Sequence, residues 1–192
     1  MSNLIKVVGV DPAFRNTGYA IGTVDIDTFE IKIIGLYLSK TAKIEKSQRK
    51  VVRANSDDIS RAKILVADFK RITSAVQIVF AEVPHGAQSA SAAKSNGVCY
   101  GMLASCELPL IQLTQGEVKI AAVGKKTASK CEMIEWGMLQ HPEANWKTRK
   151  SKGVMVPVND NEHLADAVAT IYAGVITEEF NAAITMMRSI VA

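Results

Sequence analysis

Acidic and histidine side chains bind cations or transfer protons, and four such residues of this sequence lie within regular patterns of apolar residues. Asp11 ends an apolar run rich in valine, and Glu82 lies near the end of a second apolar run. His163 and Asp166 are three positions apart in a helical pattern, so they share one face of a helix. A carboxylate at the end of a central strand is a common place for a metal ion, because hard cations take oxygen ligands. The elements around Asp11 decide whether it has such partners.

The segment around Asp11 has the pattern of a strand followed by a tight reversal. Residues 7–10 are nearly all apolar, as in a strand buried on both faces in the middle of a sheet. Pro12 cannot donate a hydrogen bond to a sheet, and Gly18 tolerates turn geometry. The first strand should therefore end at Asp11, and a second should start at Tyr19. Taken alone, this segment fits a hairpin whose aspartate caps the turn as well as it fits a metal ligand.

The rest of the chain reads as strands and helices of ordinary length. Asn159 and Glu162 have the spacing of a capping box at the start of the helix that carries the late acidic pair. We predict one α/β domain over residues 1–192, with exposed, irregular basic insertions near 40–55 and 141–158. The further strands are expected over residues 19–24, 30–38, 77–83 and 108–113, and the helices over residues 57–74, 89–106, 115–123, 127–139, about 159–172 and 178–191.

The charge of the chain is mildly basic and unevenly distributed. The formal net charge is +4 and the pI is about 8.9, while 48% of the residues are hydrophobic, which fits a globular protein. Clustered cations favour a polyanionic partner, although solvated loops explain any single cluster more simply. Three groups stand out: Lys40, Lys43, Lys46, Arg49, Lys50 and Arg53; Lys119, Lys125, Lys126 and Lys130; and Lys147, Arg149, Lys150 and Lys152.

The cysteine pattern and the lengths of the apolar runs indicate the cellular compartment in which the protein is expected. Cys99, Cys106 and Cys131 lack metal-site spacing and sit in apolar patterns, so we expect buried free thiols in a reducing compartment. No apolar run approaches 18 residues, and the N-terminus has no signal-like segment. The sequence therefore predicts an intracellular, cytoplasmic protein without a membrane partner.

The order of these motifs resembles that of the RuvC-type Holliday junction resolvases of the ribonuclease H-like superfamily, and within them the phage-encoded versions. The implied fold is α/β, with a mixed five-stranded sheet in the order β-β-β-α-β-α-β-α flanked by helices. If the gene is from a phage, the protein would act in the cytoplasm of the bacterial host. The resemblance rests on four segments that span residues 5–172, namely GVDPAFRNTGYA, FAEV, VKIAAVGKKTASK and HLADAVA.

Carried over position by position, the resemblance implies that Asp11, Glu82, His163 and Asp166 are both the catalytic residues and the metal ligands. The implied activity is the nicking of four-way and other branched DNA junctions by phosphodiester hydrolysis. Two Mg²⁺ or Mn²⁺ ions would activate water and neutralise charge on the attacking and leaving oxygens. Asp11 would bridge the ions, with Glu82 and Asp166 completing oxygen-rich shells. His163, where many members have aspartate, would either ligate an ion or orient the attacking water.

The same resemblance suggests the DNA contacts and shows two departures from the family pattern. Ala13 replaces a usual glycine, which predicts that the turn after Asp11 needs no positive φ there. His85 stands where better-studied members carry an aromatic residue that stacks on bases, and histidine offers less stacking surface. Trp146 fits either a base-stacking residue or a loop anchor, and His141 is expected at the surface. The DNA-binding residues that we predict are Arg15, His85, Lys119, Lys125, Lys126 and Lys130.

Three other functions fit part of the same pattern. An actin-like ATPase or sugar kinase shares the strand-one aspartate, but it usually needs a duplicated core and glycine-rich phosphate loops, which are missing from this sequence. A protein that binds branched DNA without cutting it is the second alternative, and the presence of all four ligands argues against it. A different nuclease of the same fold, acting on RNA–DNA hybrids or on other branches, is the third, and the sequence alone separates it poorly.

The assembly follows from the symmetry of the expected substrate. A four-way junction has two equivalent strands to cut, and a homodimer with a two-fold axis presents two matching active sites. The helix expected over residues 89–106 is rich in Ala, Ser and Gly, which allows close approach of another helix. Packing within the monomer explains this composition as well, while the resemblance places the dimer helix in this region.

Overall fold

The computed structural model describes residues 3–42 and 54–191, and in this part of the chain a five-stranded mixed sheet organises the fold. The order across the sheet is β3-β2-β1-β4-β5, so β1 is central, as its apolar sequence predicts. β1 is antiparallel to β2 and parallel to β4, and β4 is parallel to β5. The strands are β1 (Leu4–Asp11), β2 (Asn16–Asp25), β3 (Ile31–Lys40), β4 (Ile78–Glu82) and β5 (Leu110–Leu113).

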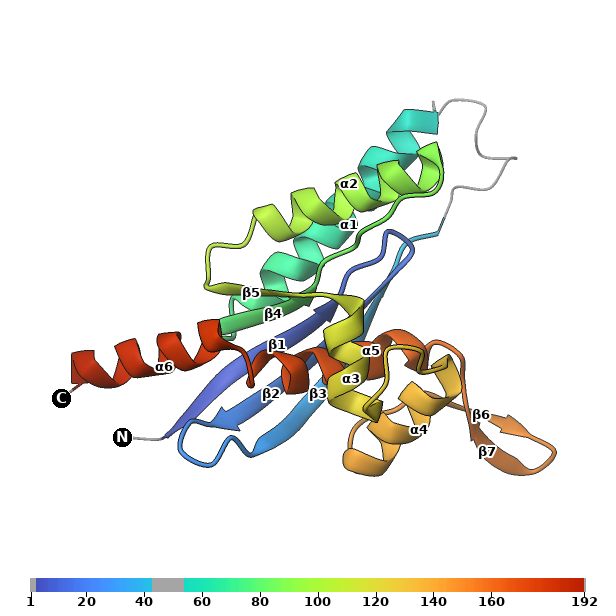
Figure 1. Ribbon diagram of the computed structural model, residues 1–192. Coiled ribbons are helices and arrows are strands. Elements are labelled where there is room, and N and C mark those ends of the chain that lie inside the picture. Colours follow the sequence, from blue (N-terminus) through green and yellow to red (C-terminus); the bar gives the residue numbers. More distant parts are fainter. Residues whose placement is uncertain (1–2, 43–53, 192) are drawn as a thin grey trace.

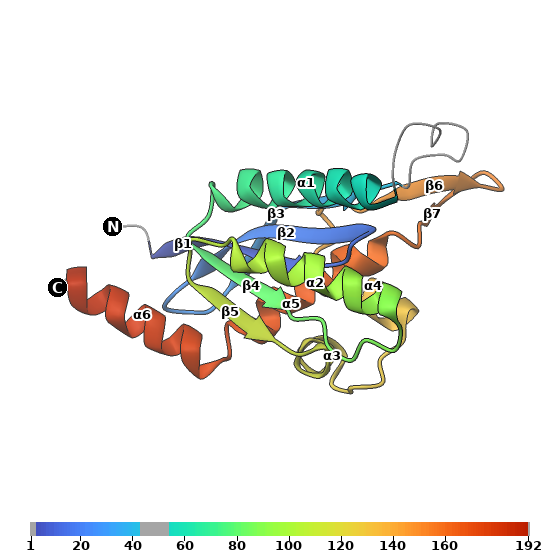
Figure 2. The same cartoon turned by 90° about the horizontal axis from the view of Figure 1, so that it is seen from above.

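The helices form two layers, one on each face of the sheet (Figures 1 and 2). α1 and α2 cover one face, and α5, with α3 and α4 beside it, covers the other. The helices are α1 (Ala54–Thr73), α2 (Ala90–Ala104), α3 (Gln115–Val123), α4 (Lys130–Gln140), α5 (Asn161–Gly174) and α6 (Glu178–Val191). The predicted order of strands and helices is therefore confirmed.

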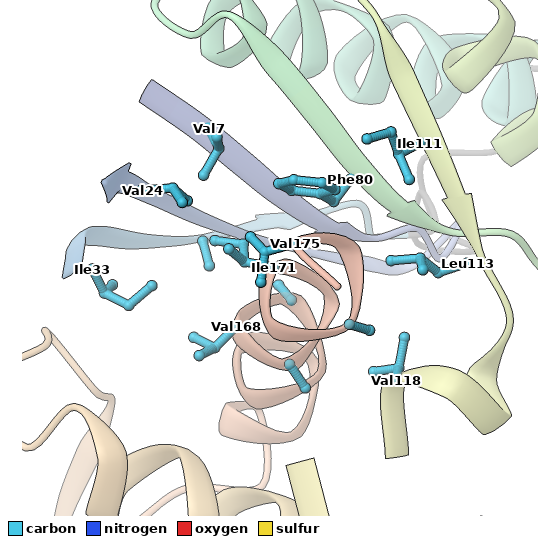
Figure 3. Packing of buried hydrophobic residues seen from close by; sticks show 14 of the residues in the cluster. Val7, Val24, Ile33, Phe80, Ile111, Leu113, Val118, Val168, Ile171 and Val175 are labelled. Atoms are coloured by element: carbon cyan, nitrogen blue, oxygen red, sulfur yellow. The ribbon is translucent and has the colours of Figure 1, made fainter. Parts of the chain in front are cut away.

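Alternation of side chains along the strands divides the core into two clusters. Val7 and Phe80 point toward α5, whereas Val8 and Val79 point toward α1 and α2. Figure 3 shows the α5 side, where Ile171 lies among side chains of the sheet. Because both faces of β1 and β4 are covered, the acids at the ends of these strands are held at fixed positions.

Two glycines set the distance between α5 and the sheet. A Cβ added to Gly9 would lie 2.0 Å from the carbonyl oxygen of Ala167, and one added to Gly18 would lie 2.0 Å from that of His163. No side chain fits at either position, so the backbone of α5 rests directly on β1 and β2. This close approach brings the first two turns of the helix to the end of β1.

Several expected boundaries are wrong, each for a local reason. β2 begins at Asn16 rather than Tyr19, because its first residues pair with the end of β3. α5 begins at Asn161, and the preceding Asp160 makes no side-chain cap, so the expected capping box at Asn159 is absent. Glu162 instead pairs with Lys130 at 2.6 Å. The true capping boxes of the described helices begin α3 and α4, at Thr114 and Ser129.

The basic insertions also differ from the expectation of irregular loops. Of the first, residues 43–53 lie outside the described part of the chain. The second contains a two-stranded antiparallel hairpin, β6 (Thr148–Ser151) and β7 (Val154–Pro157). The alternation of polar and apolar residues that usually reveals a strand is absent there, because Lys, Arg and Ser occupy one strand and apolar residues the other.

His141, Trp146 and the three cysteines test the predicted exposure of individual side chains. His141 is only 4% exposed, not at the surface, and its Nε2 lies 2.9 Å from the hydroxyl of Tyr172. Trp146 donates its indole N–H to the carbonyl oxygen of His141 and packs against the core, so it is a loop anchor. All three cysteines are free, but Cys131 is exposed and Cys106 half-buried, and only Cys99 is buried as predicted.

Candidate active site

Asp11 and His163 meet at the end of β1, although 152 positions separate them in sequence. Nδ1 of His163 lies 2.6 Å from Oδ2 of Asp11, and the two side chains are 22% and 14% exposed. An ionised carboxylate can only accept, so Nδ1–H donates and Nε2 faces away from this bond, free for another partner. Burial alone lowers the pKa of His163, but the bond to Asp11 and the surrounding acids outweigh it, and the net pKa is raised.

Glu82 and Asp166 complete a group of acids in the same region. Burial first, and then the negative charges of Asp11 and Asp166, raise the pKa of Glu82 to about 8. Burial first, and then the negative charges of Asp11 and Glu162, raise the pKa of Asp166 to about 7. Glu82 and Asp166 therefore both feel the charge of Asp11. β1 and β4 are parallel neighbours, which explains why Asp11 and Glu82 share one edge of the sheet.

The donor set of this region fits a hard divalent cation. Carboxylate oxygens with an imidazole are suitable ligands for Mg²⁺ or Mn²⁺. The pKa values of Glu82 and Asp166 are raised by burial and by neighbouring negative charge, and a bound cation would offset both effects. Among the described residues, no three His, Cys, Asp or Glu side chains are already arranged closely enough to hold an ion. Binding would thus require side-chain rotation, most simply at Asp11, whose carboxylate is engaged by His163.

The turn after Asp11 is held by a buried arginine that sequence patterns did not single out. Arg61 is 6% exposed, and its guanidinium lies 4.0 Å from the ring centroid of Phe14. It donates to Oγ1 of Thr41 at 3.2 Å, while Oγ1 of Thr17 donates to the carbonyl of Ala13 at 2.8 Å. Ala13 is not among the residues with positive φ, as predicted. No sequence signal could reveal Arg61, because its partners are 20 and 47 positions away.

The predicted basic residues lie at different distances from the acids. The positive charge of Lys119 lowers the pKa of both Glu82 and Asp166, so this half-buried residue of α3 borders the acidic group. Lys125 pairs with Glu132, and Lys130 pairs with Glu162. Lys126 is exposed on the same turn. Lys125 and Lys130 are therefore partly neutralised.

Arg15 and His85 are exposed, on loops that follow the two strand-borne acids. Arg15 lines an open pocket of about 310 Å³ with Arg61 and residues of α2. The loop of His85 is fixed by Tyr100, whose hydroxyl donates to the carbonyl oxygen of Pro84. Tyr100 was missed by sequence reasoning, although an aromatic residue within a run of small residues was the available signal.

Two further acids near Asp166 have other partners. Asp160 is paired with Lys40, and this hydrogen bond lowers the pKa of its carboxyl. Glu162 is paired with Lys130. Both acids are therefore engaged in ion pairs, and Glu162 does not make the helix cap expected from its spacing.

Comparison with known proteins gives the fold a family context. No family model matches the sequence. The RuvC crossover junction endodeoxyribonuclease of Albidiferax ferrireducens is 26% identical over 132 residues, which are 68% of this chain and 69% of that protein. The corresponding protein of an Acidovorax species is 25% identical over 138 residues, covering 68% and 70%.

Solved structures agree with these relatives at the level of the fold. A structure of T. thermophilus RuvC in complex with a Holliday junction substrate aligns with a TM-score of 0.62 and 17% identity, covering 88% of this chain and 92% of that one. The predicted ribonuclease H-like α/β fold is thereby confirmed. Among the described residues, no helix has the length and apolar character needed to cross a membrane. In sequence, this chain is thus similar to RuvC crossover junction endodeoxyribonucleases over about two thirds of its length, and it shares its fold with T. thermophilus RuvC.

Proposed function

We propose that this protein is a metal-dependent endonuclease that nicks four-way DNA junctions by phosphodiester hydrolysis. One observation carries the proposal: three carboxyl groups and an imidazole, from β1, β4 and α5, gather at one edge of a ribonuclease H-like sheet. Burial and neighbouring negative charge raise the pKa values of Glu82 and Asp166, so ionising these acids is costly for the folded protein. A cost of this kind is expected where a cationic cofactor binds.

Each residue of the group has a distinct proposed role. Asp11, Glu82 and Asp166 would hold the divalent ions, which supply charge neutralisation and an acidified water when bound. His163 orients Asp11 through Nδ1, and its Nε2 is left to accept a proton from the attacking water or to act as a ligand. The charge of Lys119 partly offsets the rise in the pKa of Glu82 and Asp166, and Lys119 is suited to contact the phosphate next to the scissile bond.

The exposed face of α2 supports the expected homodimer. Its outward positions form a helical stripe of small residues, and an ideal Cβ on Gly97 or Gly101 meets nothing within 4 Å. A second copy could therefore approach closely along this stripe. Tyr100 joins α2 to the loop after Glu82, so the interface would be coupled directly to the active site. The phage origin and the cytoplasmic location remain predictions of the resemblance.

The test is cleavage of a panel of labelled substrates with Mg²⁺ and separately with Mn²⁺. The panel contains a four-way junction, a Y-fork, a linear duplex and an RNA–DNA hybrid. We expect paired nicks in the junction, and Asp11→Asn should abolish them while leaving junction binding within about threefold, because the carboxylate holds metal and not DNA. Substantial cleavage by this variant at saturating Mg²⁺ would refute the assignment. Preference for the hybrid would instead favour a ribonuclease H activity.

A further inference from the structure

The hairpin β6–β7 projects from the body of the protein at the end where α5 begins (Figures 1 and 2). Its two-residue turn is Lys152 and Gly153, with φ values of 47° and 85°. Positive φ at both positions is the mark of a type I′ turn, whose twist matches that of the flanking strands. The hairpin is therefore a regular element with a defined register and not a loose loop.

Charge and apolar surface are combined on both faces of this hairpin. Lys150 is opposite Met155, and Arg149 is opposite Val156, so each cross-strand pair joins a cation to an apolar side chain on one face. Val154 and Met155, next to the turn, are 65% and 59% exposed. No acidic residue occurs between positions 147 and 158. The hairpin therefore presents cations on β6 and at the turn beside an exposed apolar pair, a surface that would match a partner with both negative charge and apolar faces.

The base of the hairpin is fixed to the start of α5 by a buried asparagine. Oδ1 of Asn161 accepts from the backbone N–H of Lys147, and its Nδ2 donates to the carbonyl oxygen of Lys147, both at 2.9 Å. Asn161 is fully buried and lies two positions before His163. The orientation of the hairpin is thus tied to the helix that carries His163 and Asp166.

We propose that this hairpin is a branch-point arm, which places its cations on the backbones of two junction arms and its apolar tip against bases at the crossover. Phosphates match the charge of Arg149, Lys150 and Lys152, and bases that are unstacked at a branch offer apolar faces to Val154 and Met155. The rigid connection through Asn161 then sets the distance between the branch point and the scissile phosphate.

The inference rests on the proposed function only in taking branched DNA as the partner. It goes further in assigning recognition of the branch itself to a specific element, distinct from the acidic group and from the lysines of α3 and α4. Linear duplex offers phosphates to the arm but no unstacked bases to its tip. Selectivity for branched over linear DNA should therefore depend on the apolar residues, and general affinity on the cations.

Binding without divalent cations tests the arm independently of cleavage. Fluorescence anisotropy with a labelled four-way junction in EDTA gives the affinity across a range of salt concentrations. Arg149→Gln with Lys150→Gln should reduce the slope of log affinity against log salt by about 1.8, from counterion release at two phosphates. The control pair, Lys32→Gln with Lys70→Gln, removes two exposed charges at the opposite end of the sheet and should leave the slope unchanged.

The apolar tip is tested by Val154→Thr with Met155→Thr, which keeps strand propensity and removes apolar surface. This variant should keep the salt slope but lose about tenfold in selectivity for the junction over a duplex of the same length. 2-Aminopurine placed at the crossover should brighten on binding of the wild-type protein, because unstacking relieves its quenching, and should brighten less with the variant.

Lys152→Asn tests the contribution of the charge at the turn without weakening the fold of the hairpin. Asparagine is favoured at this turn position, so the substitution should leave the hairpin at least as stable while the salt slope falls by about 0.9. Hairpin variants that bind the junction exactly as the control pair does would overturn the proposal, as would an apolar-tip variant that changes only self-association in sedimentation. A wild-type protein that binds the junction without cutting it under any metal would refute the endonuclease and leave the arm supported, whereas one that binds no branched DNA would refute both.

Discussion

Glu82→Gln is expected to make the metal-free protein more stable while it destroys the proposed activity. The pKa of Glu82 is raised from 4.5 to about 8, first by burial and then by the charges of Asp11 and Asp166. Between pH 4.5 and 8, the unfolded chain releases this proton and the folded protein keeps it. The free energy of unfolding therefore falls as pH rises through this window, by up to about 1.4 kcal/mol per pH unit. Above pH 8 both states have released the proton, and the loss of stability has reached its full size.

The size of the effect follows from the same window. At pH 7 the cost accumulated above the ordinary pKa is on the order of 3 kcal/mol, and part of it arises from the charges of Asp11 and Asp166. Glutamine has nearly the same shape and no charge to lose, so we expect Glu82→Gln to gain about 1–3 kcal/mol in the free energy of unfolding at pH 7. For a chain of this length the melting temperature should rise by about 3–9 °C.

The assay is urea and thermal unfolding in EDTA at pH 5 and pH 8, for the wild-type protein, Glu82→Gln and the control Glu135→Gln. Glu135 is exposed on α4, so its substitution should change stability little at either pH. The advantage of Glu82→Gln should be small at pH 5 and large at pH 8. Addition of Mg²⁺ should stabilise the wild-type protein more than the variant. An advantage that did not grow with pH would refute the electrostatic account of the site.

Three further predictions concern assembly, packing and pH. Gly101→Arg should convert the expected dimer to a monomer without loss of thermal stability, because the position is open in the monomer. Light scattering measures the assembly, and a cruciform nicking assay counts the nicks. Paired nicks by a monomeric variant would contradict the dimer model. Gly18→Ala should lose about 1–3 kcal/mol of stability and most activity, since its Cβ would lie 2.0 Å from the carbonyl oxygen of His163. The control Gly116→Ala makes only ordinary contacts and should change the free energy of unfolding in urea very little. Burial lowers the pKa of His141, so at a pH below the ordinary pKa of histidine the unfolded chain binds a proton that the folded protein does not, and stability is lost. His141→Gln should reduce this loss of stability between pH 7 and pH 5, measured by urea unfolding. If the dependence of stability on pH is the same in the variant, this residue is not its source.

The sequence by itself predicted the strands of the main sheet and placed two acids at the ends of buried strands. A run of apolar residues that ends in one carboxylate, as at Asp11 and Glu82, is a local pattern, because burial on both faces excludes charge until the strand ends. The one-sided pattern of α6 is equally local, and Phe180 and Ile184 on its apolar side are buried. Such features depend on neighbours within a few positions, so periodicity is enough to find them.

Only the tertiary structure decided how distant segments meet. The bond between His163 and Asp11 depends on the absence of side chains at Gly9 and Gly18, which lets α5 rest on the sheet. The burial of His141 depends on Tyr172, 31 positions away. Long-range contacts of this kind leave no periodic trace, because each partner satisfies only its own local pattern.

The hairpin β6–β7 illustrates the same limit on a smaller scale. Its turn, Lys152 and Gly153, was present in the sequence as a local signal, but the strands lack alternation because neither face is buried against the core. Its direction is set by the two hydrogen bonds of Asn161 to Lys147, which only the folded chain forms. Backbone pairing and one buried amide, rather than hydrophobic patterning, thus determine where this part of the surface points.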